Sequence, residues 1–121
     1  MLSPETVKRD FYEMGEFHDA RIEAIAWFAS KASLHLSLED LYHNFQGLPE
    51  YPGPQSGTLE FFGVSDFKIE LSRGEPLFVS DLAIALSESE GRGIASLTFR
   101  PSGRLSFAFE GARYPVLALK Q

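Results

Sequence analysis

Alternating apolar and polar residues form the most regular pattern in the chain, and the pattern is clearest over residues 34–39. Leucine occupies every second position there, which places three leucines on one side of an extended strand. Residues 94–110 repeat the alternation around a Pro-Ser-Gly sequence that is typical of a turn. Both stretches therefore predict antiparallel hairpins that bury one apolar face.

A second strand is expected directly before the leucine strand, and its register stays open. In one register the even-numbered apolar residues face the interior, with Phe28 opposite Leu34. In the other, Trp27 faces the interior and the strands meet in a two-residue turn at Ser30-Lys31. A slip of one residue exchanges the two faces. Because this strand is apolar on both faces, the amino-terminal helix is a candidate to cover the second one.

The carboxyl-terminal hairpin allows a more specific prediction. Placing Arg100 opposite Arg104 sets Leu97 opposite Phe107 and makes one face wholly apolar. The other face carries small and polar residues, the usual sign of a solvated side: Ser96, Thr98, Ser106 and Ala108. Residues 80–87 fit either a strand or a helix, and a last strand is predicted over 114–119.

The amino terminus has the signals of a helix start. A serine can cap the free backbone N–H groups, proline suits the first helical position, and an acid lies near the positive end of the helix dipole. Apolar residues then recur at spacings of four and three to form one stripe: Val7, Phe11 and Met14. We predict a short helix over 4–14 that docks on the sheet.

One helix and about seven or eight strands, without alternation of strand and helix, predict an α+β fold that is mainly β. We expect an antiparallel β-sandwich or a half-open barrel, with one amino-terminal helix on a face or at an end of it. At 121 residues the chain fits a single domain, 1–121. Its expected parts are a helix over 4–14, a first hairpin over 21–40, an irregular loop over 41–57 and the remaining strands over 58–119.

The stretch 41–57 has no periodicity and is rich in proline and glycine. Loops of this length without internal structure are uncommon in compact domains and often bind a ligand or partner. Its candidate binding residues are Tyr42, His43, Phe45 and Tyr51. The alternative is a surface Ω-loop that is held together by its own aromatic side chains.

Charge is unevenly distributed along the chain. Residues 1–90 hold 16 of the 17 acidic side chains, whereas residues 91–121 hold five of the 11 basic ones. A net charge of −6 repels a phosphate backbone, so we expect no nucleic-acid partner. A basic protein is the better candidate partner. Alternatively, the basic end of the chain pairs with acidic strands of the same fold.

The location of the protein is inferred from what the sequence lacks. It has no cysteine, which excludes disulfides and is compatible with a reducing cytoplasm. Its first residues have neither a basic start nor an apolar run, so we expect no signal peptide. No uncharged apolar run approaches the ~18 residues that span a bilayer, so no membrane is expected either. We therefore expect a cytoplasmic protein.

Candidate catalytic residues are few. His18 and Asp19 are adjacent at a helix-to-strand junction and could serve acid–base chemistry, with His35 as a third member. Neighbouring side chains of an extended segment point in opposite directions, which argues against a shared substrate atom. The structural interpretation is that His18 packs or bonds to the backbone while Asp19 satisfies the turn. His35 is then a solvated residue on the strand face opposite the leucines.

No metal and no cofactor are expected. The three histidines show no recognised ligand spacing, and the chain has no cysteine to complete a site. Gly91-Arg92-Gly93 lacks the lysine and hydroxyl of a phosphate-binding loop, so we interpret it as a hairpin turn.

The order of these segments resembles that of small bacterial β-rich proteins of unknown function, some of which are grouped with immunity proteins that neutralise a toxin by binding it. The resemblance is carried by residues 17–22 entering a strand, by Leu34-His35-Leu36, by residues 59–64 and by the closing strand pair. It implies a cytoplasmic, non-enzymatic bacterial protein and transfers no catalytic residue.

Two functions follow as hypotheses. The first is a non-enzymatic binding module that presents the loop 41–57 to a protein partner, with its aromatics as anchors. Exposed strand edges would also permit a homodimer. The second is a small-ligand pocket or an acid–base hydrolase that uses His18 and Asp19. It requires these side chains to converge on one cleft.

Overall fold

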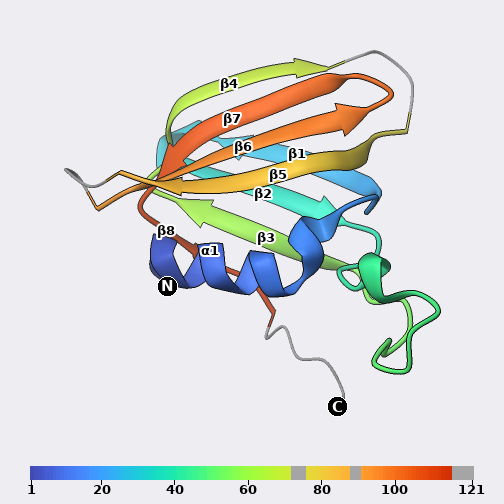
Figure 1. The fold of residues 1–121 in the computed structure, drawn as a ribbon. Coiled ribbons are helices and arrows are strands. Elements are labelled where there is room, and N and C mark those ends of the chain that lie inside the picture. Colours follow the sequence, from blue (N-terminus) through green and yellow to red (C-terminus); the bar gives the residue numbers. More distant parts are fainter. Residues whose placement is uncertain (72–75, 88–90, 116–121) are drawn as a thin grey trace.

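Two four-stranded antiparallel sheets and one amino-terminal helix make up the computed structural model of the protein, which describes residues 1–71, 76–87 and 91–115 (Figure 1). The first sheet has the strand order β1-β2-β3-β8, which are Ile22–Phe28, Ser33–Leu38, Gly57–Phe62 and Gly111–Arg113. The second has the order β4-β7-β6-β5, which are Ser65–Leu71, Gly103–Phe109, Gly93–Arg100 and Phe78–Leu86. The predicted mainly β sandwich with one amino-terminal helix is confirmed.

The core lies between the two sheets and is built from the alternating apolar positions. Leu34, Leu36 and Leu38 of β2 are buried, as their spacing predicts. Phe61 of β3 meets Phe107 of β7 with ring centroids 4.9 Å apart. Since full burial of a leucine or phenylalanine side chain contributes about 1.5–3 kcal/mol, these inward faces hold the sheets together.

β1 takes the second of the two registers that the sequence allows. Trp27 lies opposite Leu34 and Ile25 lies opposite Leu36. The strands do not meet in a two-residue turn, because the 3₁₀ turn Ala29–Lys31 separates them. The sequence therefore limited the pairing to two registers but did not choose between them, and it did not predict the length of the connection.

The helix α1 spans Pro4–Glu13, one residue less than predicted. Ser3 caps it by accepting a hydrogen bond from the N–H of Thr6 at 3.3 Å. It does not cover β1, and that expectation is wrong: α1 packs beside β5 and β8 at the opposite side of the sandwich (Figure 1). The two sheet edges there leave core aromatics to be covered, and Phe11 reaches Phe61 with ring centroids 6.2 Å apart.

The final hairpin pairs two residues away from the predicted register, with Leu97 opposite Leu105. β6 pairs with β5 as far as Arg100 but with β7 only as far as Thr98, so the turn between β6 and β7 spans residues 99–103. A shift of two residues leaves each side chain on its face. Ser96 and Thr98 of the predicted solvated face are accordingly exposed, whereas Ser106 is half-buried and Ala108 is buried where it pairs with Ser65 at the start of β4.

Two other predictions concern the carboxyl-terminal half. Residues 80–87, which fitted either a strand or a helix, mostly belong to strand β5. The last described strand begins at Gly111, because glycine there admits the amino-terminal segment, and Leu2 N–H donates to the carbonyl of Ala112 at 2.7 Å. The predicted strand 114–119 extends beyond the described residues.

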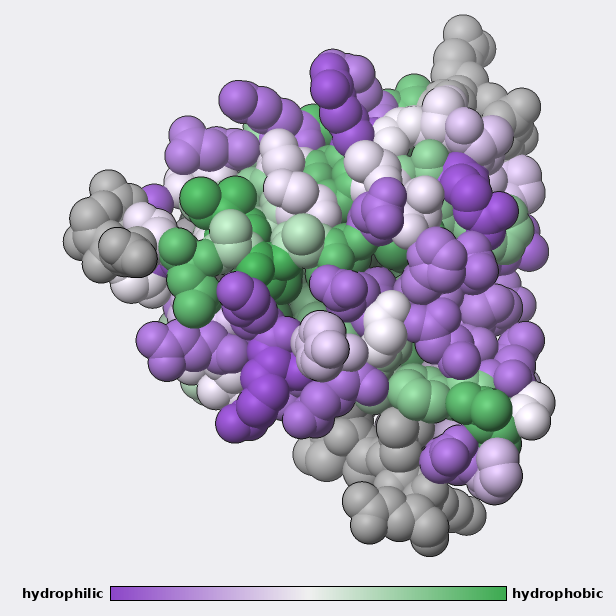
Figure 2. Space-filling model, viewed as in Figure 1, coloured by the Kyte–Doolittle hydropathy of each residue, from purple (hydrophilic) through white to green (hydrophobic). Residues whose placement is uncertain are grey.

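Hydrophilic residues cover most of the molecular face in Figure 2. Apolar residues gather over the end of the β5–β6 hairpin, where Leu86 and Ile94 are 39% and 44% exposed. Among the residues that the structure describes, no helix is both long enough and apolar enough to cross a membrane.

Candidate functional site

The loop 41–57 is fixed to the fold by Asp40, a buried carboxylate just after β2. One of its oxygens accepts hydrogen bonds from the backbone N–H groups of Tyr42 at 3.0 Å and Gln55 at 3.1 Å. The other accepts from the hydroxyl of Tyr51 at 2.6 Å, a bond that raises the pKa of Tyr51. One side chain therefore ties together both ends and the middle of the loop, which is the Ω-loop arrangement.

A second attachment joins this loop to the helix. The side-chain amide of Asn44 donates to the carbonyl oxygens of Gly15 at 2.6 Å and Met14 at 3.3 Å. Carbonyl groups at a helix end lack partners within the helix, so this amide both caps α1 and positions the loop. The loop is thereby held from the strand side and from the helix side.

The four candidate binding residues of the loop differ in exposure. Tyr42 is 5% exposed and belongs to the core, while Phe45 and Tyr51 are half-buried and pack against it. His43 is also half-buried. Their role in binding stays a prediction, and Tyr42 can reach a partner only if the loop opens.

Two residues that the sequence analysis did not single out define the loop. Asp40 fixes its conformation, and Leu48 is its exposed apolar residue, at 50%. An acidic residue directly after a strand was the available signal for Asp40, because such residues often accept backbone N–H groups of the following turn. Leu48 lies between glycine and proline, which are typical of turns, and turns lie mostly at the protein surface.

The segment joining α1 to β1 has an unusual backbone. Glu16, Phe17 and Asp19 have φ angles of 56°, 54° and 65°, in the left-handed region that residues other than glycine seldom adopt. Phe17 is buried and meets Phe11 edge-to-face with centroids 5.0 Å apart, which anchors the segment. Such conformations persist only where the surroundings fix them, and they concentrate at functional sites.

His18 and Asp19 do contact each other, with Nε2 and Oδ2 3.5 Å apart. The expectation that they diverge is wrong because Asp19 is left-handed rather than extended. Nδ1 of His18 lies 2.7 Å from the carbonyl of Ser80, which can only accept, so Nδ1 carries a proton. The Asp19 carboxylate also accepts a charge-assisted hydrogen bond from Arg100. His18 thus bonds to the backbone, as the structural interpretation predicted, whereas the carboxylate of Asp19 contacts Arg100 and His18 instead of the N–H groups of the turn.

A cleft of about 280 Å³ lies beside this junction and the loop. Its lining residues are Asp19, Arg21, Glu39, Asp40, His43, Gln46, Pro54 and Phe78. Three of them are carboxylates, and Arg21 pairs with Glu39 at 3.6 Å. The cleft therefore brings together Asp19 and His43 of the predicted site residues.

His35 lies elsewhere, on the outer face of the first sheet. Its ring packs at a tilt against that of Phe28 with centroids 4.8 Å apart, and its Nε2 lies 3.7 Å from Oε1 of Glu60. Arg113 donates to the second oxygen of Glu60 at 2.6 Å and holds the pKa of that carboxyl below its usual value. The structure thus gives His35 partners other than His18 and Asp19.

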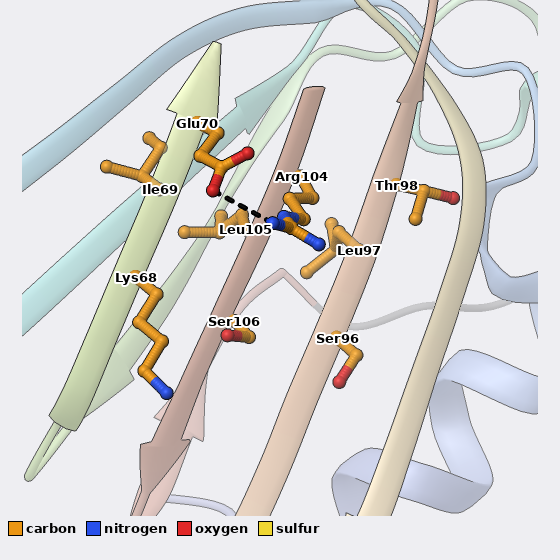
Figure 3. Close-up of a pocket in the computed structure, with 9 residues that line it drawn as sticks. All are labelled: Lys68, Ile69, Glu70, Ser96, Leu97, Thr98, Arg104, Leu105 and Ser106. Carbon is orange, nitrogen blue, oxygen red and sulfur yellow. Dashed lines mark hydrogen bonds and ion pairs between the residues drawn. The ribbon is translucent and has the colours of Figure 1, made fainter. Parts of the chain in front are cut away.

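The outer face of the second sheet carries a shallow depression of about 390 Å³ (Figure 3). Small hydroxyl side chains, Ser96 and Ser106, lie along it, and Lys68 borders it. On the same face Arg104 donates to Glu70 at 2.9 Å. This is the chemistry of a solvated sheet face, as the alternation predicted.

Arginines from the last third of the chain pair with acids from the first two thirds. The pairs are Arg100 with Asp19, Arg104 with Glu70 and Arg113 with Glu60. The uneven charge of the sequence is therefore partly neutralised within the fold, which was the alternative to a basic partner. Exposed pairs of this kind contribute little to the stability of the fold. A basic partner must be recognised by other acidic groups.

Metal binding needs three or more ligands that converge. Among residues 1–71, 76–87 and 91–115, no group of three or more histidine, aspartate or glutamate side chains has that arrangement.

No family model matches the chain, and no curated protein matches it. A crystal structure of an uncharacterized protein from Neisseria gonorrhoeae superposes with a TM-score of 0.54 and 13% sequence identity. The match covers 84% of this chain and 94% of that one. At this identity the likeness shows the fold alone. The protein is thus a two-sheet β-sandwich with a helix at one side.

Proposed function

We propose that the protein is a non-enzymatic, cytoplasmic binding module whose interface is the loop 41–57 together with the acidic cleft beside it. The observation that carries the proposal is the set of three hydrogen bonds to Asp40, which fix a long loop while Leu48 remains 50% exposed. A loop already in its bound conformation loses little entropy on association, so its contacts yield more affinity.

The partner that fits this surface is a protein with a basic contact region. Glu50 lies two residues from Leu48, and one of its carboxylate oxygens is shielded from solvent without a hydrogen-bond donor. Glu50 is half-buried, and a lysine or arginine of the partner would complement its negative charge beside Leu48 without reaching the enclosed oxygen. The net charge of −6 would also steer a basic partner towards the protein.

An immunity-type role is the specific form of this proposal. It rests on the sequence resemblance described above, in which the domain neutralises a toxin by binding it. A rigid loop with one exposed leucine beside an acidic side chain suits such inhibitory binding, because a few central contacts carry most of the energy of tight complexes.

Affinity capture with matched variants tests the proposal. We expect the wild-type protein to retain a basic protein that Leu48→Ser and Glu50→Gln lose, while Leu86→Ser, which changes an exposed leucine on the β5–β6 hairpin, retains it. Circular dichroism checks that all variants fold. Equal capture by all four proteins would contradict the proposal.

A small-ligand pocket with acid–base chemistry is the second candidate. The contact between His18 and Asp19, beside a cleft that His43 also lines, favours it. Ligand screening by thermal shift tests it: a ligand that stabilises the wild type but not Asp19→Asn would support this function. A ligand response unchanged in Asp19→Asn would oppose it.

A further inference from the structure

The edge strand β4 exposes apolar side chains at the side of the sandwich that lies opposite the helix. Ile69 and Leu71 are 39% and 43% exposed. Trp27 of β1 is 42% exposed beside them and packs on Phe67 with ring centroids 4.9 Å apart. These residues form one apolar edge composed of Trp27, Phe67, Ile69 and Leu71.

Backbone groups at this edge also lack partners. β4 is the outermost strand of its sheet and pairs only with β7 among the described residues (Figure 1). The N–H and C=O groups on its other side are therefore available to another strand. Exposed apolar side chains and unused backbone groups together define a docking edge.

Charges on β4 select its partner. Lys68 and Glu70 lie two residues apart on one face of the strand, and Ile69 lies on the other face (Figure 3). An antiparallel copy of β4 centred on Ile69 would place Lys68 opposite Glu70 in both directions. It would also place Phe67 opposite Leu71.

Other registers are less favourable. A strand that extends a sheet must keep its faces, so the pairing can move only in steps that preserve the side-chain alternation. Centring on Lys68 would oppose two lysines, and centring on Glu70 would oppose two glutamates, both of which are repulsive. Beyond Lys68 the strand is irregular, because Asp66 has a φ of 53° within a bulge.

We propose that the protein forms a symmetric homodimer in which β4 pairs antiparallel with β4 of a second copy, centred on Ile69. The contact joins the two second sheets into one and covers the apolar edge of each protomer. An isologous contact of this kind closes on itself and does not propagate into a fibre. The dimer uses a different surface from the loop 41–57 and is independent of the proposed function.

β1, the neighbouring edge strand, does not specify such a dimer. Its outward face carries Ala24, Ala26 and Phe28, none of which is charged. Its one charged residue, Glu23, lies at a bulge and has no opposite charge on the strand with which it could fix a register against a second copy. The complementary pair on β4 therefore makes the second copy a specific partner rather than one of many.

The test is analytical ultracentrifugation of the full chain over a concentration series. We expect the wild type to dimerise, and each of Lys68→Glu and Glu70→Lys to dissociate at least about tenfold more readily, because both cross-strand pairs become repulsive. Mixing the two variants should restore the dimer, since each substituted position then faces its opposite charge. Restoration also shows that both variants are folded.

Arg104→Gln is the matched control, because it removes the ion pair of Glu70 within the protomer and leaves the β4 edge unchanged. It should dimerise as the wild type does. A wild type that stays monomeric throughout the series would overturn the proposal. So would single variants that dimerise normally, or a mixture that shows no recovery.

Discussion

Asp40 is the residue on which the loop 41–57 depends. Its two oxygens accept three hydrogen bonds, from two backbone N–H groups and one phenol. The sequence predicted an irregular loop with aromatic residues, and it left open whether these would face a partner or hold the loop. It could not predict that Tyr42 enters the core, because an aperiodic stretch contains no signal for which side chains point inwards.

Replacing Asp40 therefore has a large expected effect. Asp40→Ala leaves two backbone N–H groups without their acceptor, and we expect a loss of about 2–3 kcal/mol in the free energy of unfolding. Asp40→Asn keeps one carbonyl acceptor and should lose less. Urea denaturation measures both, and equal stability of Asp40→Ala and the wild type would show that the loop is held by other contacts.

Tyr114 makes stability depend on alkaline pH. Burial, together with the hydrogen bond that its hydroxyl donates to Asp10 at 2.7 Å, raises the pKa of Tyr114 above its ordinary value. A raised pKa in the folded state means that the unfolded state releases the proton first, near pH ~10. The stability that the protonated Tyr114 contributes is thus present below that pH and is lost as the pH rises above it.

The corresponding variant is Tyr114→Phe. Below pH ~10 it should be less stable by about 1 kcal/mol, because the hydrogen bond is absent. Above that pH the difference from the wild type should shrink, since phenylalanine does not ionise. Urea midpoints between neutral and alkaline pH measure this, and a difference that stays constant with pH would contradict the assignment.

Among the secondary-structure elements, those with a strict period were the most predictable. The leucine strand β2 and the apolar stripe of α1 follow directly from spacings of two and of three or four residues. The packing position of α1 could not be predicted, because the apolar stripe indicates which face of the helix is buried but not which strands that face contacts. The predicted register of the last hairpin was also wrong, because its turn spans residues 99–103 and is longer than the Pro-Ser-Gly sequence indicated.

Neighbouring residues of α1 test its packing. Phe11 is 1% exposed between the sheets, whereas Tyr12 is 76% exposed. We expect Phe11→Ala to lower the free energy of unfolding by about 3–5 kcal/mol. Tyr12→Ala should change it by less than about 0.5 kcal/mol. Chemical denaturation of both variants measures this, and similar effects at the two positions would refute the observed docking.

The whole molecule presents two independent surfaces, the loop with its cleft and the edge of β4. Composition and alternation sufficed to predict the class of fold. The sequence also indicated the loop 41–57, but it could not locate the cleft beside the loop or the exposed edge of β4, because these depend on how segments far apart in the chain meet. His18 and Asp19 illustrate this: a left-handed backbone at Asp19 brings together side chains that the sequence pattern would separate.

The proposed function depends on the loop 41–57 having one fixed conformation. Amide hydrogen exchange measures whether the loop is fixed, at the N–H groups of Tyr42 and Gln55, which donate hydrogen bonds to Asp40. We predict protection comparable to that of β2 in the wild type and its loss in Asp40→Ala, with β2 still protected. If both amides of the wild type exchange at the rate of an unstructured peptide, the loop has no fixed conformation and the proposed interface is wrong.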